Sequence, residues 1–240
     1  MGRTIETGHA VNLSNCKLLI DACASFGADY SPDNTDLAIT AMMAKWLAGT
    51  AGQKAYVTAL ESIRQPMNTR KKLFVGIIPL LTRVLGELNS THADAQLKAE
   101  IKTIADEIHS IMIPAVKKSK GNTITIAISQ SHTGCVQRAN SFFNLIEMLK
   151  TIPEYAPKKD FIKIPALIDV HAGMEAANNN IGALLNAADD AMLQRNYILY
   201  TPGTGIVDTA LACKQYIKGS YGNNSTEYRM VTKINFRNLA

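Results

Sequence analysis

Apolar residues recur at intervals of three and four along most of the chain, which is the period of amphipathic α-helices. The clearest run lies in the second half, at Leu167, Val170, Met174, Ala177, Ile181, Leu184 and Ala188. It predicts one helix that ends near Tyr200 after roughly 40 residues, or about 60 Å at 1.5 Å per residue. We therefore expect a mainly all-α fold, a helical bundle with long amphipathic helices.

Shorter runs of the same period predict the remaining helices. In the first half they cover residues 12–27, 34–66, 77–88 and 97–111. In the second half they cover residues 140–152, 204–219 and 225–234. Proline lacks a backbone N–H and clashes with the preceding helical turn, so Pro66 is expected to kink or break the helix that contains it. Pro32 and Pro157 are expected to separate successive helices in the same way.

The chain repeats itself at an offset of 125 residues. Residues 29–42 read DYSPDNTDLAITAM, and residues 154–167 read EYAPKKDFIKIPAL. Tyr30, Pro32, Ile39 and Ala41 recur at this offset as Tyr155, Pro157, Ile164 and Ala166. A repeat of this length indicates a duplicated helical unit, because two copies are too few for a solenoid.

The duplication predicts three segments. The first helical repeat covers residues 1–116, a linker covers residues 117–138, and the second helical repeat covers residues 139–240. We expect the two repeats to pack on each other.

The linker contains a pattern of a different period. Its residues 123–129 read TITIAIS, in which β-branched residues alternate, and this alternation predicts a β-strand over residues 122–130. Two other short stretches could pair with the strand, RTIETG at residues 3–8 and TKINFR at residues 232–237. The sequence therefore predicts a small β element formed by the linker and the chain termini. An open edge of such a strand would be a template for self-association.

Composition and charge narrow the class of protein. Apolar residues make up 47% of the 240 residues, which is enough for a sizeable core. No run of about 18 uncharged apolar residues occurs, and the opening MGRTIETGHAVNLSN lacks the apolar run of a signal peptide. We expect a cytoplasmic protein with no membrane association. The net charge of +5 is spread over both halves, so it is compatible with an anionic partner without requiring one.

Candidate chemistry is sparse. The four cysteines have no spacing suited to zinc and are expected to be buried, reduced thiols. Ser131, His132 and Cys135 lie close together, but a nucleophile needs a base and an orienting group from elsewhere in the fold, so a polar loop is favoured. The glycines of TPGTGIVD, residues 201–208, could present amides to an anion, although a turn between helices is favoured. We expect no catalytic residue, no metal site and no cofactor.

Arg70 and Arg195 are the charged residues of most interest, because both fall on the apolar stripe and correspond at the 125-residue offset. An unpaired buried charge is costly, so each arginine is expected to pair with a carboxylate or with helix carbonyls between the repeats. A twice-repeated anion site is the alternative. The lysines that would extend such a site are Lys71, Lys72, Lys117, Lys118 and Lys120.

Several motifs resemble an uncharacterised bacterial family of internally duplicated helical proteins. They are GHAVN near the start, the two Tyr-x-Pro turns, the Asn-x-Arg of MNTRKKLF, and the closing TGIVDTALACKQYIK and YIKGSYG followed by EYRMV. The resemblance spans nearly the whole chain. It implies the same duplicated helical architecture, and no established activity comes with it.

The leading expectation for function is a non-enzymatic structural or interaction protein, which self-associates or binds a protein partner. A duplicated scaffold, long amphipathic helices and the lack of a convergent catalytic set favour this class. The alternative is an anion- or nucleic-acid-binding helical module that uses the segment between Glu61 and Glu87, where no acidic residue occurs. Such weak polyanion binding would fall steeply with salt. The predicted strand or the long-helix face would provide a self-association surface.

Overall fold

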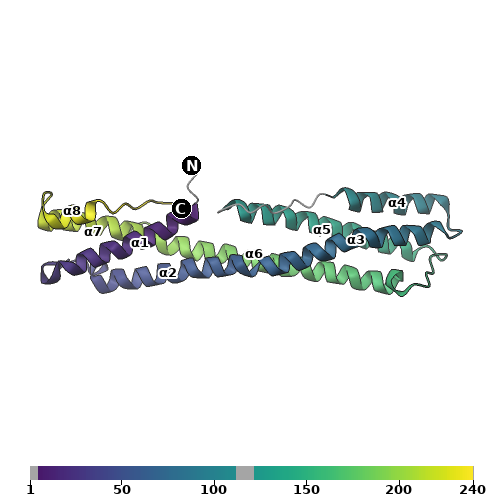
Figure 1. Ribbon diagram of the computed structural model, residues 1–240, viewed down its shortest axis with the longest axis horizontal. Helices are drawn as coiled ribbons and strands as arrows, with labels where there is room; N and C mark the ends of the chain where they lie inside the picture. The colour runs from purple at the N-terminus through teal and green to yellow at the C-terminus, as the bar shows by residue number, and fades with distance from the viewer. Residues whose placement is uncertain (1–4, 112–121, 240) are drawn as a thin grey trace. The chain divides into compact units, whose positions relative to one another are not determined.

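Helices account for nearly all of the regular structure in the computed structural model, which describes residues 5–111 and 122–239 (Figure 1). The α-helices are α1 (Ile5–Ser25), α2 (Ile39–Ser62), α3 (Arg64–Asn89), α4 (Ala95–Ser110), α5 (Asn122–Lys150), α6 (Ile164–Tyr200), α7 (Ile206–Tyr221) and α8 (Thr226–Thr232). Three short 3-10 helices, η1 (Gly27–Asp29), η2 (Thr35–Leu37) and η3 (Asp160–Ile162), lie in the connections. The all-α prediction is confirmed, since these ranges contain no strand.

The predicted β element is wrong for the residues that the structure describes. Residues 122–130 form the first turns of α5, and residues 233–239 form neither helix nor strand. The strand prediction relied on the β-branched residues of TITIAIS, whose preference against a helix is only some tenths of a kcal/mol per residue. Extending a helix that already exists adds a hydrogen bond with each residue and outweighs that preference. Most of the predicted linker, from residue 122 onward, is therefore part of α5.

The described chain forms two compact units. The first unit contains α1, α2, the part of α6 from Asn186 onward, α7 and α8. The second unit contains α3, α4, α5 and the part of α6 up to Leu185. These units cut across the predicted repeats, because each unit takes helices from residues 1–116 and from residues 139–240.

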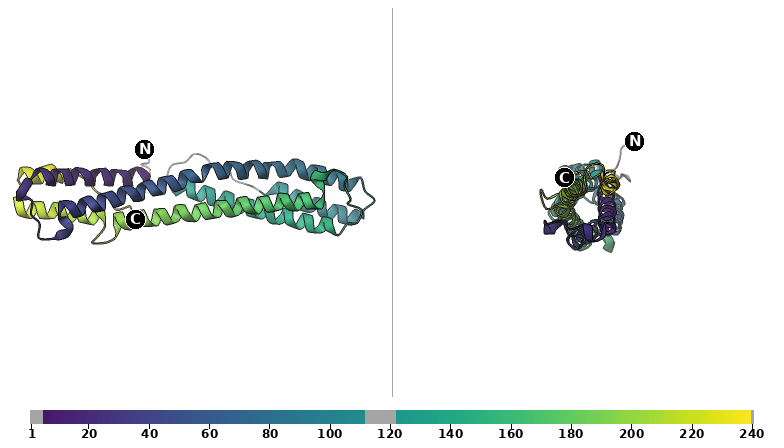
Figure 2. Two further views of the ribbon diagram at one scale, coloured as in Figure 1. Left: turned by 90° about the horizontal axis from the view of Figure 1, so that it is seen from below. Right: turned by 90° about the vertical axis from the view of Figure 1, so that its left-hand side faces the viewer.

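The core of the first unit joins α1, α2, α6, α7 and α8. Its most deeply buried side chains are Leu19, Ile20, Cys23, Leu199, Cys213, Ile217 and Val231. Helices α1 and α7 pack against each other, and α8 packs on both (Figures 1 and 2). Helices α2 and α6 approach closely at Gly52, where an added Cβ would lie 3.4 Å from the Cα of Arg195, at van der Waals contact. This close approach places the polar residues of α2 and α6 against each other.

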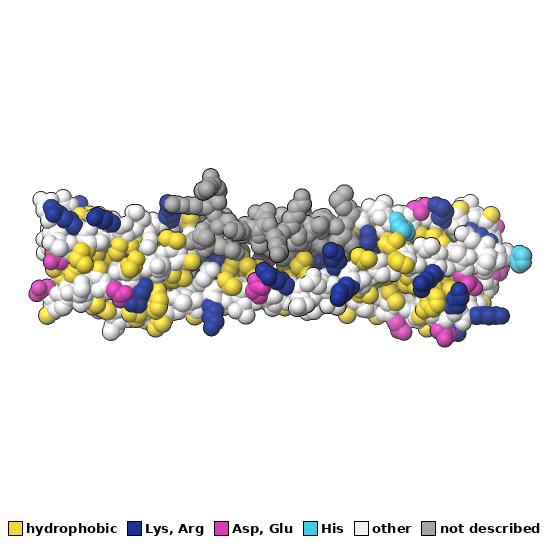
Figure 3. All heavy atoms as spheres, viewed as in Figure 1, with side chains coloured by type: hydrophobic (Ala, Val, Ile, Leu, Met, Phe, Trp, Pro, Cys, Tyr) yellow, Lys and Arg dark blue, Asp and Glu magenta, His cyan; other side chains and the backbone are white. Residues whose placement is uncertain are grey.

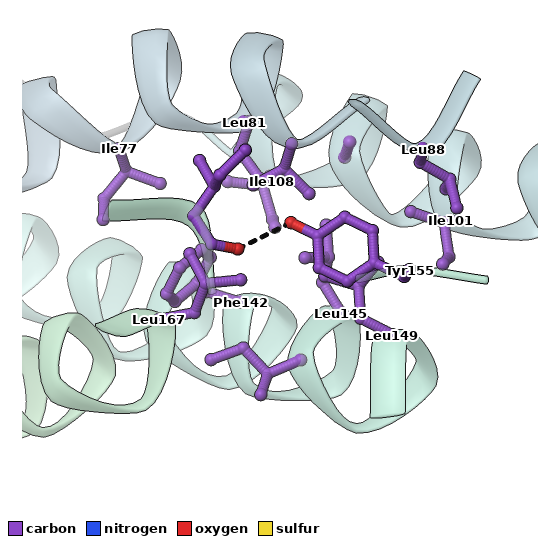
Figure 4. Packing of buried hydrophobic residues seen from close by; sticks show 14 of the residues in the cluster. Ile77, Leu81, Leu88, Ile101, Ile108, Phe142, Leu145, Leu149, Tyr155 and Leu167 are labelled. Atoms are coloured by element: carbon purple, nitrogen blue, oxygen red, sulfur yellow. Dashed lines mark hydrogen bonds between the residues drawn. The ribbon is translucent and has the colours of Figure 1, made fainter. Parts of the chain in front are cut away.

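The core of the second unit joins α3, α4, α5 and the first turns of α6. Figure 4 shows side chains from all four helices pointing toward one another, among them Leu81, Ile108, Phe142 and Leu167. All four are fully buried, and burying a side chain of this size contributes about 1.5–3 kcal/mol. This apolar packing, rather than helix propensity, is what stabilises the unit.

The two Tyr-x-Pro turns share one hydrogen bond. The hydroxyl of Tyr30 donates a hydrogen bond to the carbonyl of Leu37 over 2.8 Å, and the hydroxyl of Tyr155 donates one to Ile162 over the same distance (Figure 4). Both tyrosines are buried, and in both turns a 3-10 helix follows before the next α-helix begins. A buried hydroxyl needs such a partner, so the tyrosine fixes the chain reversal.

Helix ends follow the expected chemistry. Asn34 caps η2 by accepting a hydrogen bond from the N–H of Asp36, and Asp94 caps α4. Pro66 lies in the first turn of α3, which a proline tolerates, and α2 ends before it, as the sequence predicts. No helix within the described ranges has an apolar stretch long enough to cross a membrane.

Candidate functional site

Arg195 lies in a buried polar cluster of the first unit. Its side chain is only 3% exposed, and its guanidinium group stacks on the ring of Tyr56 at 4.5 Å from the ring centroid. The amide oxygen of Asn196 accepts hydrogen bonds from its Nε and Nη2, and Gln53 accepts one at 3.5 Å. The electron-rich face of Tyr56 and these amide oxygens offset part of the cost of burying the charge.

A second group of polar side chains lies beside this arginine. The Nδ2 of Asn12 donates to the hydroxyl of Tyr200 over 3.3 Å and to the carbonyl of Arg237 over 2.7 Å. Nδ1 of His9 lies 2.6 Å from the same hydroxyl. The hydroxyl oxygen accepts from Asn12, and its single proton can be donated to Nδ1 of His9 when that nitrogen is unprotonated. This arrangement accommodates a neutral histidine.

Electrostatics favour the same protonation state. Burial, together with the positive charge of Arg195, lowers the pKa of His9 to about 4. Burial also raises the pKa of Tyr200. Both side chains are buried. Their hydrogen bonds tie α1, α6 and the C-terminal segment together.

A surface groove runs between α1 and α2, next to this cluster. The groove has a volume of about 730 Å³ and is lined by Ala10, Leu13, Ser14, Lys17, Trp46, Thr50, Gln53, Lys54, Val57 and Thr58. Trp46 is the only tryptophan of the chain, and its indole N–H donates to the carbonyl of Leu13 over 3.1 Å. Lys17 lies over the indole ring, and Lys54 is exposed on α2. We call this feature the α1–α2 groove: its apolar surface is bordered by cations.

Helix α6 presents an exposed apolar stripe in the same unit. Leu193 is 61% exposed and Tyr197 is 72% exposed, and exposed Asp190 precedes them at helical spacing. We call these three residues the α6 stripe. Figure 3 shows hydrophobic side chains at the molecular surface, with charged side chains between them. Large apolar side chains that are exposed together on one helix face are typical of a contact surface.

Arg70 is buried in the second unit, where it is 2% exposed. Its positive charge acts to lower the pKa of the buried thiol of Cys135. The charge of Arg138, which follows Cys135 by one turn of α5, acts in the same direction. Burial nevertheless raises the pKa of Cys135, so the thiol is not activated as a nucleophile. Arg138 donates to the carbonyl of Ile111 over 2.6 Å and so caps the C-terminus of α4, where a cation is favourable.

The described structure does not place the predicted basic residues in one compact unit. Arg70 and Arg195 belong to different units, and Lys71 and Lys72 are exposed on α3. Lys117, Lys118 and Lys120 lie outside the described residues. The expectation of a contact between the repeats at the two arginines stays a prediction.

The other candidate motifs also have structural explanations. In TPGTGIVD, the carboxylate of Asp208 accepts a hydrogen bond from the N–H of Gly203 over 2.8 Å. This N–H therefore binds a carboxylate of the chain itself in place of an external anion. The segment is a turn between α6 and α7. Ser131 and His132 lie within α5 rather than in a loop. Among the described residues, no group of three or more His, Cys, Asp or Glu side chains is placed to hold a metal ion.

Comparisons with protein families, with curated proteins and with solved structures found no match to this chain.

Sequence reasoning missed the His9–Asn12 group and the groove. The first had a signal: His9 and Asn12 continue the buried stripe of Cys16, Leu19 and Cys23 toward the N-terminus at the same spacing. Polar residues on a buried stripe indicate a hydrogen-bonded network. The groove had no signal, because it depends on how far apart α1 and α2 lie.

Proposed function

We propose that this chain is a non-enzymatic interaction protein that self-associates, with the α1–α2 groove of one copy holding the α6 stripe of a second copy. The observation that carries the proposal is the exposure of Leu193 and Tyr197 on one face of a helix. Exposing two large apolar side chains together is unfavourable in water, and a partner surface removes that cost.

The groove has the chemistry to receive the stripe. Leu13, Trp46 and Val57 offer apolar surface, and the indole ring is well suited to pack against a tyrosine ring. Lys54 provides a positive charge that matches the acidic Asp190 of the stripe. An amphipathic helix in an apolar groove is a common mode of protein recognition.

The size of the contact sets the expected affinity. Stable interfaces bury about 1,200–2,000 Å² in total, and a contact built around two side chains lies at or below the lower limit of that range. We therefore expect a dissociation constant in the micromolar range, or about −8 kcal/mol. This range is convenient for dilution experiments.

Trp46 makes the proposal testable without a label, because it is the only tryptophan and lines the groove. Diluting the full-length chain through the micromolar range should shift the tryptophan emission to the red as the stripe leaves the groove. Sedimentation velocity over the same concentrations should show a dimer or larger species dissociating to a monomer. The two transitions should have the same midpoint.

Substitutions separate the proposed contact from general stickiness. Tyr197→Glu should weaken association at least tenfold, because it places a charge opposite the apolar floor of the groove. The matched control is Val75→Glu on α3, since Val75 is 60% exposed and lies in the second unit. Circular dichroism should show unchanged helicity for both variants. A wild-type chain that stays monomeric at high concentration, or equal effects of the two variants, would contradict the proposal.

We further infer that the chain arose by duplication and that the two copies have exchanged their second halves. Each unit then combines the first half of one copy with the second half of the other. Support comes from the matching hydrogen bonds of Tyr30 and Tyr155 and from buried arginines at corresponding positions. One unit boundary follows Glu61 and the other follows Leu185, so the separation between the two boundaries agrees with the 125-residue offset to within one residue. This inference agrees with the resemblance to a family of duplicated helical proteins.

Polyanion binding by α3 is the second candidate function. Its solvent side carries exposed Arg64, Lys71, Lys72 and Arg83 in a segment without acidic residues. Few aromatic residues are available for base stacking, and Phe161 already lies under the guanidinium group of Arg83. A gel-shift assay with single-stranded DNA at two salt concentrations tests it: Lys71→Glu/Lys72→Glu should abolish a shift that is present at low salt. No shift at low salt would rule it out.

A further inference from the structure

Two buried thiols meet in the first unit. Cys23 of α1 and Cys213 of α7 are both fully buried, and their Sγ atoms lie 3.5 Å apart. The two residues are 190 positions apart in sequence, so the contact exists only in the folded chain. Both cysteines are reduced in this structure.

Tyr30 completes a hydrogen-bonded chain with these thiols. Its hydroxyl proton goes to the carbonyl of Leu37, so its oxygen accepts from the S–H of Cys213, 3.3 Å away. The S–H of Cys23 can then be donated to Sγ of Cys213. The sulfur of Cys213 is therefore in contact with two hydroxyl or thiol groups at once, which is more polar than a core thiol requires.

The repeat provides a comparison for this arrangement. At the 125-residue offset, Cys23 and Cys213 correspond to Met148 and Leu88 of the second unit, where Tyr155 keeps its hydrogen bond to Ile162. Apolar side chains therefore suffice to pack beside a turn of this kind. The packing of the fold gives no reason for two thiols at van der Waals distance.

We propose that Cys23 and Cys213 form an oxidation site that hydrogen peroxide converts to a disulfide, which links α1 to α7. The thiolate of Cys213 attacks one oxygen of the peroxide, the O–O bond breaks, and hydroxide leaves, so Cys213 becomes a sulfenic acid. The thiol of Cys23 then attacks Sγ of Cys213, the S–S bond forms, and water leaves. Overall, two thiols are oxidised and one peroxide is reduced to two waters.

The surroundings assign the order of the two steps. The hydrogen bond from Cys23 lowers the pKa of Cys213, while the same contact raises the pKa of Cys23. Cys213 is thus the first to react, and Cys23 resolves the sulfenic acid. Burial raises the pKa of neighbouring Cys16 to about 12, so Cys16 remains a thiol and does not compete. A small, neutral oxidant is required because neither sulfur is exposed.

Thiol counting on the full-length chain tests the proposal. After peroxide treatment and denaturation without reductant, N-ethylmaleimide should add to two cysteines instead of the four that are free before treatment. Peptide mapping should find one crosslink, between Cys23 and Cys213, which dithiothreitol reverses. The crosslink should raise the melting temperature by about 5–15 °C, because it closes a long loop in the unfolded chain.

Matched variants give the controls. Cys16→Ala and Cys135→Ser should keep the crosslink, whereas Cys213→Ala should abolish it while helicity by circular dichroism is unchanged. Oxidation of exposed Met230 to the sulfoxide shows that the peroxide dose was effective. Four alkylated cysteines at a dose that oxidises Met230, a crosslink that includes Cys16, or sulfinic acid on Cys213 without a crosslink would each overturn the proposal.

Discussion

At the scale of single residues, one phenolic hydroxyl determines the state of two buried side chains. The hydroxyl of Tyr200 pairs with both His9 and Asn12. Tyr200→Phe leaves a buried imidazole nitrogen and part of a buried amide without this partner, so it should lower the free energy of unfolding by about 1–3 kcal/mol. Urea denaturation at neutral pH measures the loss.

Tyr197 provides the control for that substitution. It lies on the same helix, but its side chain is largely exposed, so Tyr197→Phe should change the free energy of unfolding by less than about 0.5 kcal/mol. Equal losses for the two variants would show that the Tyr200 hydrogen bonds contribute nothing specific.

His9 should make stability depend on pH. Its pKa in the folded chain is about 4, below the ordinary value of 6.5, because of burial and the charge of Arg195. The unfolded chain therefore binds more protons between these values. The stability that neutral His9 contributes is fully present above pH 6.5 and is lost as the pH falls toward 4. Between pH 7.5 and pH 5 the loss should be about 2 kcal/mol.

Urea denaturation at a series of pH values checks this expectation, and His9→Gln should flatten the profile. Staying above pH 5 keeps most carboxylates ionised. A profile of His9→Gln that still falls by the same amount would assign the pH dependence to other groups.

Sequence reasoning identified Arg70 and Arg195 as residues on a buried stripe, and both are buried. It could do so because position on a helix face depends only on local spacing. Two of the partners of Arg195, Gln53 and Tyr56, could not be predicted, since they lie about 140 residues away in sequence. Burial is thus encoded locally, whereas the partner is a property of tertiary packing.

At the scale of elements, the turn before α7 depends on a glycine. A Cβ at Gly205 would lie 2.7–2.9 Å from backbone atoms of Thr201 and Leu199, which cannot move as a side chain can. Gly205→Ala should therefore lower the free energy of unfolding by about 1–3 kcal/mol. Gly219→Ala is the matched control near the other end of α7, because no atom lies within 4 Å of a Cβ there.

The control should have the opposite sign. Alanine is a better helix former than glycine, so Gly219→Ala should raise stability by up to about 1 kcal/mol. Thermal and urea denaturation of the two variants measure both values. A neutral Gly205→Ala would show that the turn can relax around a methyl group.

The helices were predictable because apolar residues recur at every third or fourth position over many turns. The long helix expected to end near Tyr200 is α6, with 37 residues. The strand at residues 122–130 was predicted wrongly because seven residues of TITIAIS fit a β-strand as well as a buried helix. Such a short segment takes the structure of its neighbours, and here α5 continues through it.

At the scale of the whole molecule, the sequence predicted two repeats but not which helices share a core. The period of a helix identifies its buried face without identifying the face that covers it. Each compact unit here combines helices from both predicted repeats, as α2 and the end of α6 do at Gly52. The repeat at 125 residues is therefore a property of the amino-acid sequence, whereas the two cores depend on contacts between distant segments.

Charge reversal gives the sharpest test of how two copies meet. In the proposed contact, Lys54 at the groove of one copy faces Asp190 of the stripe of another. Lys54→Glu alone and Asp190→Lys alone should each weaken association by about two- to tenfold, because each places like charges opposite one another. The double variant restores opposite charges with the positions exchanged, so its dissociation constant should return to within about twofold of the wild type.

Sedimentation velocity and Trp46 emission measure the four dissociation constants at low salt, and about 0.5 M NaCl should reduce the differences between them by screening. A mixture of the two single variants provides one further check, since the groove of the Lys54→Glu chain can take the stripe of the Asp190→Lys chain. The mixture should therefore associate more tightly than either variant alone. If the dissociation constant of the double variant rises by the product of the two single fold-changes, the two residues do not face each other. The stripe then does not dock in this groove.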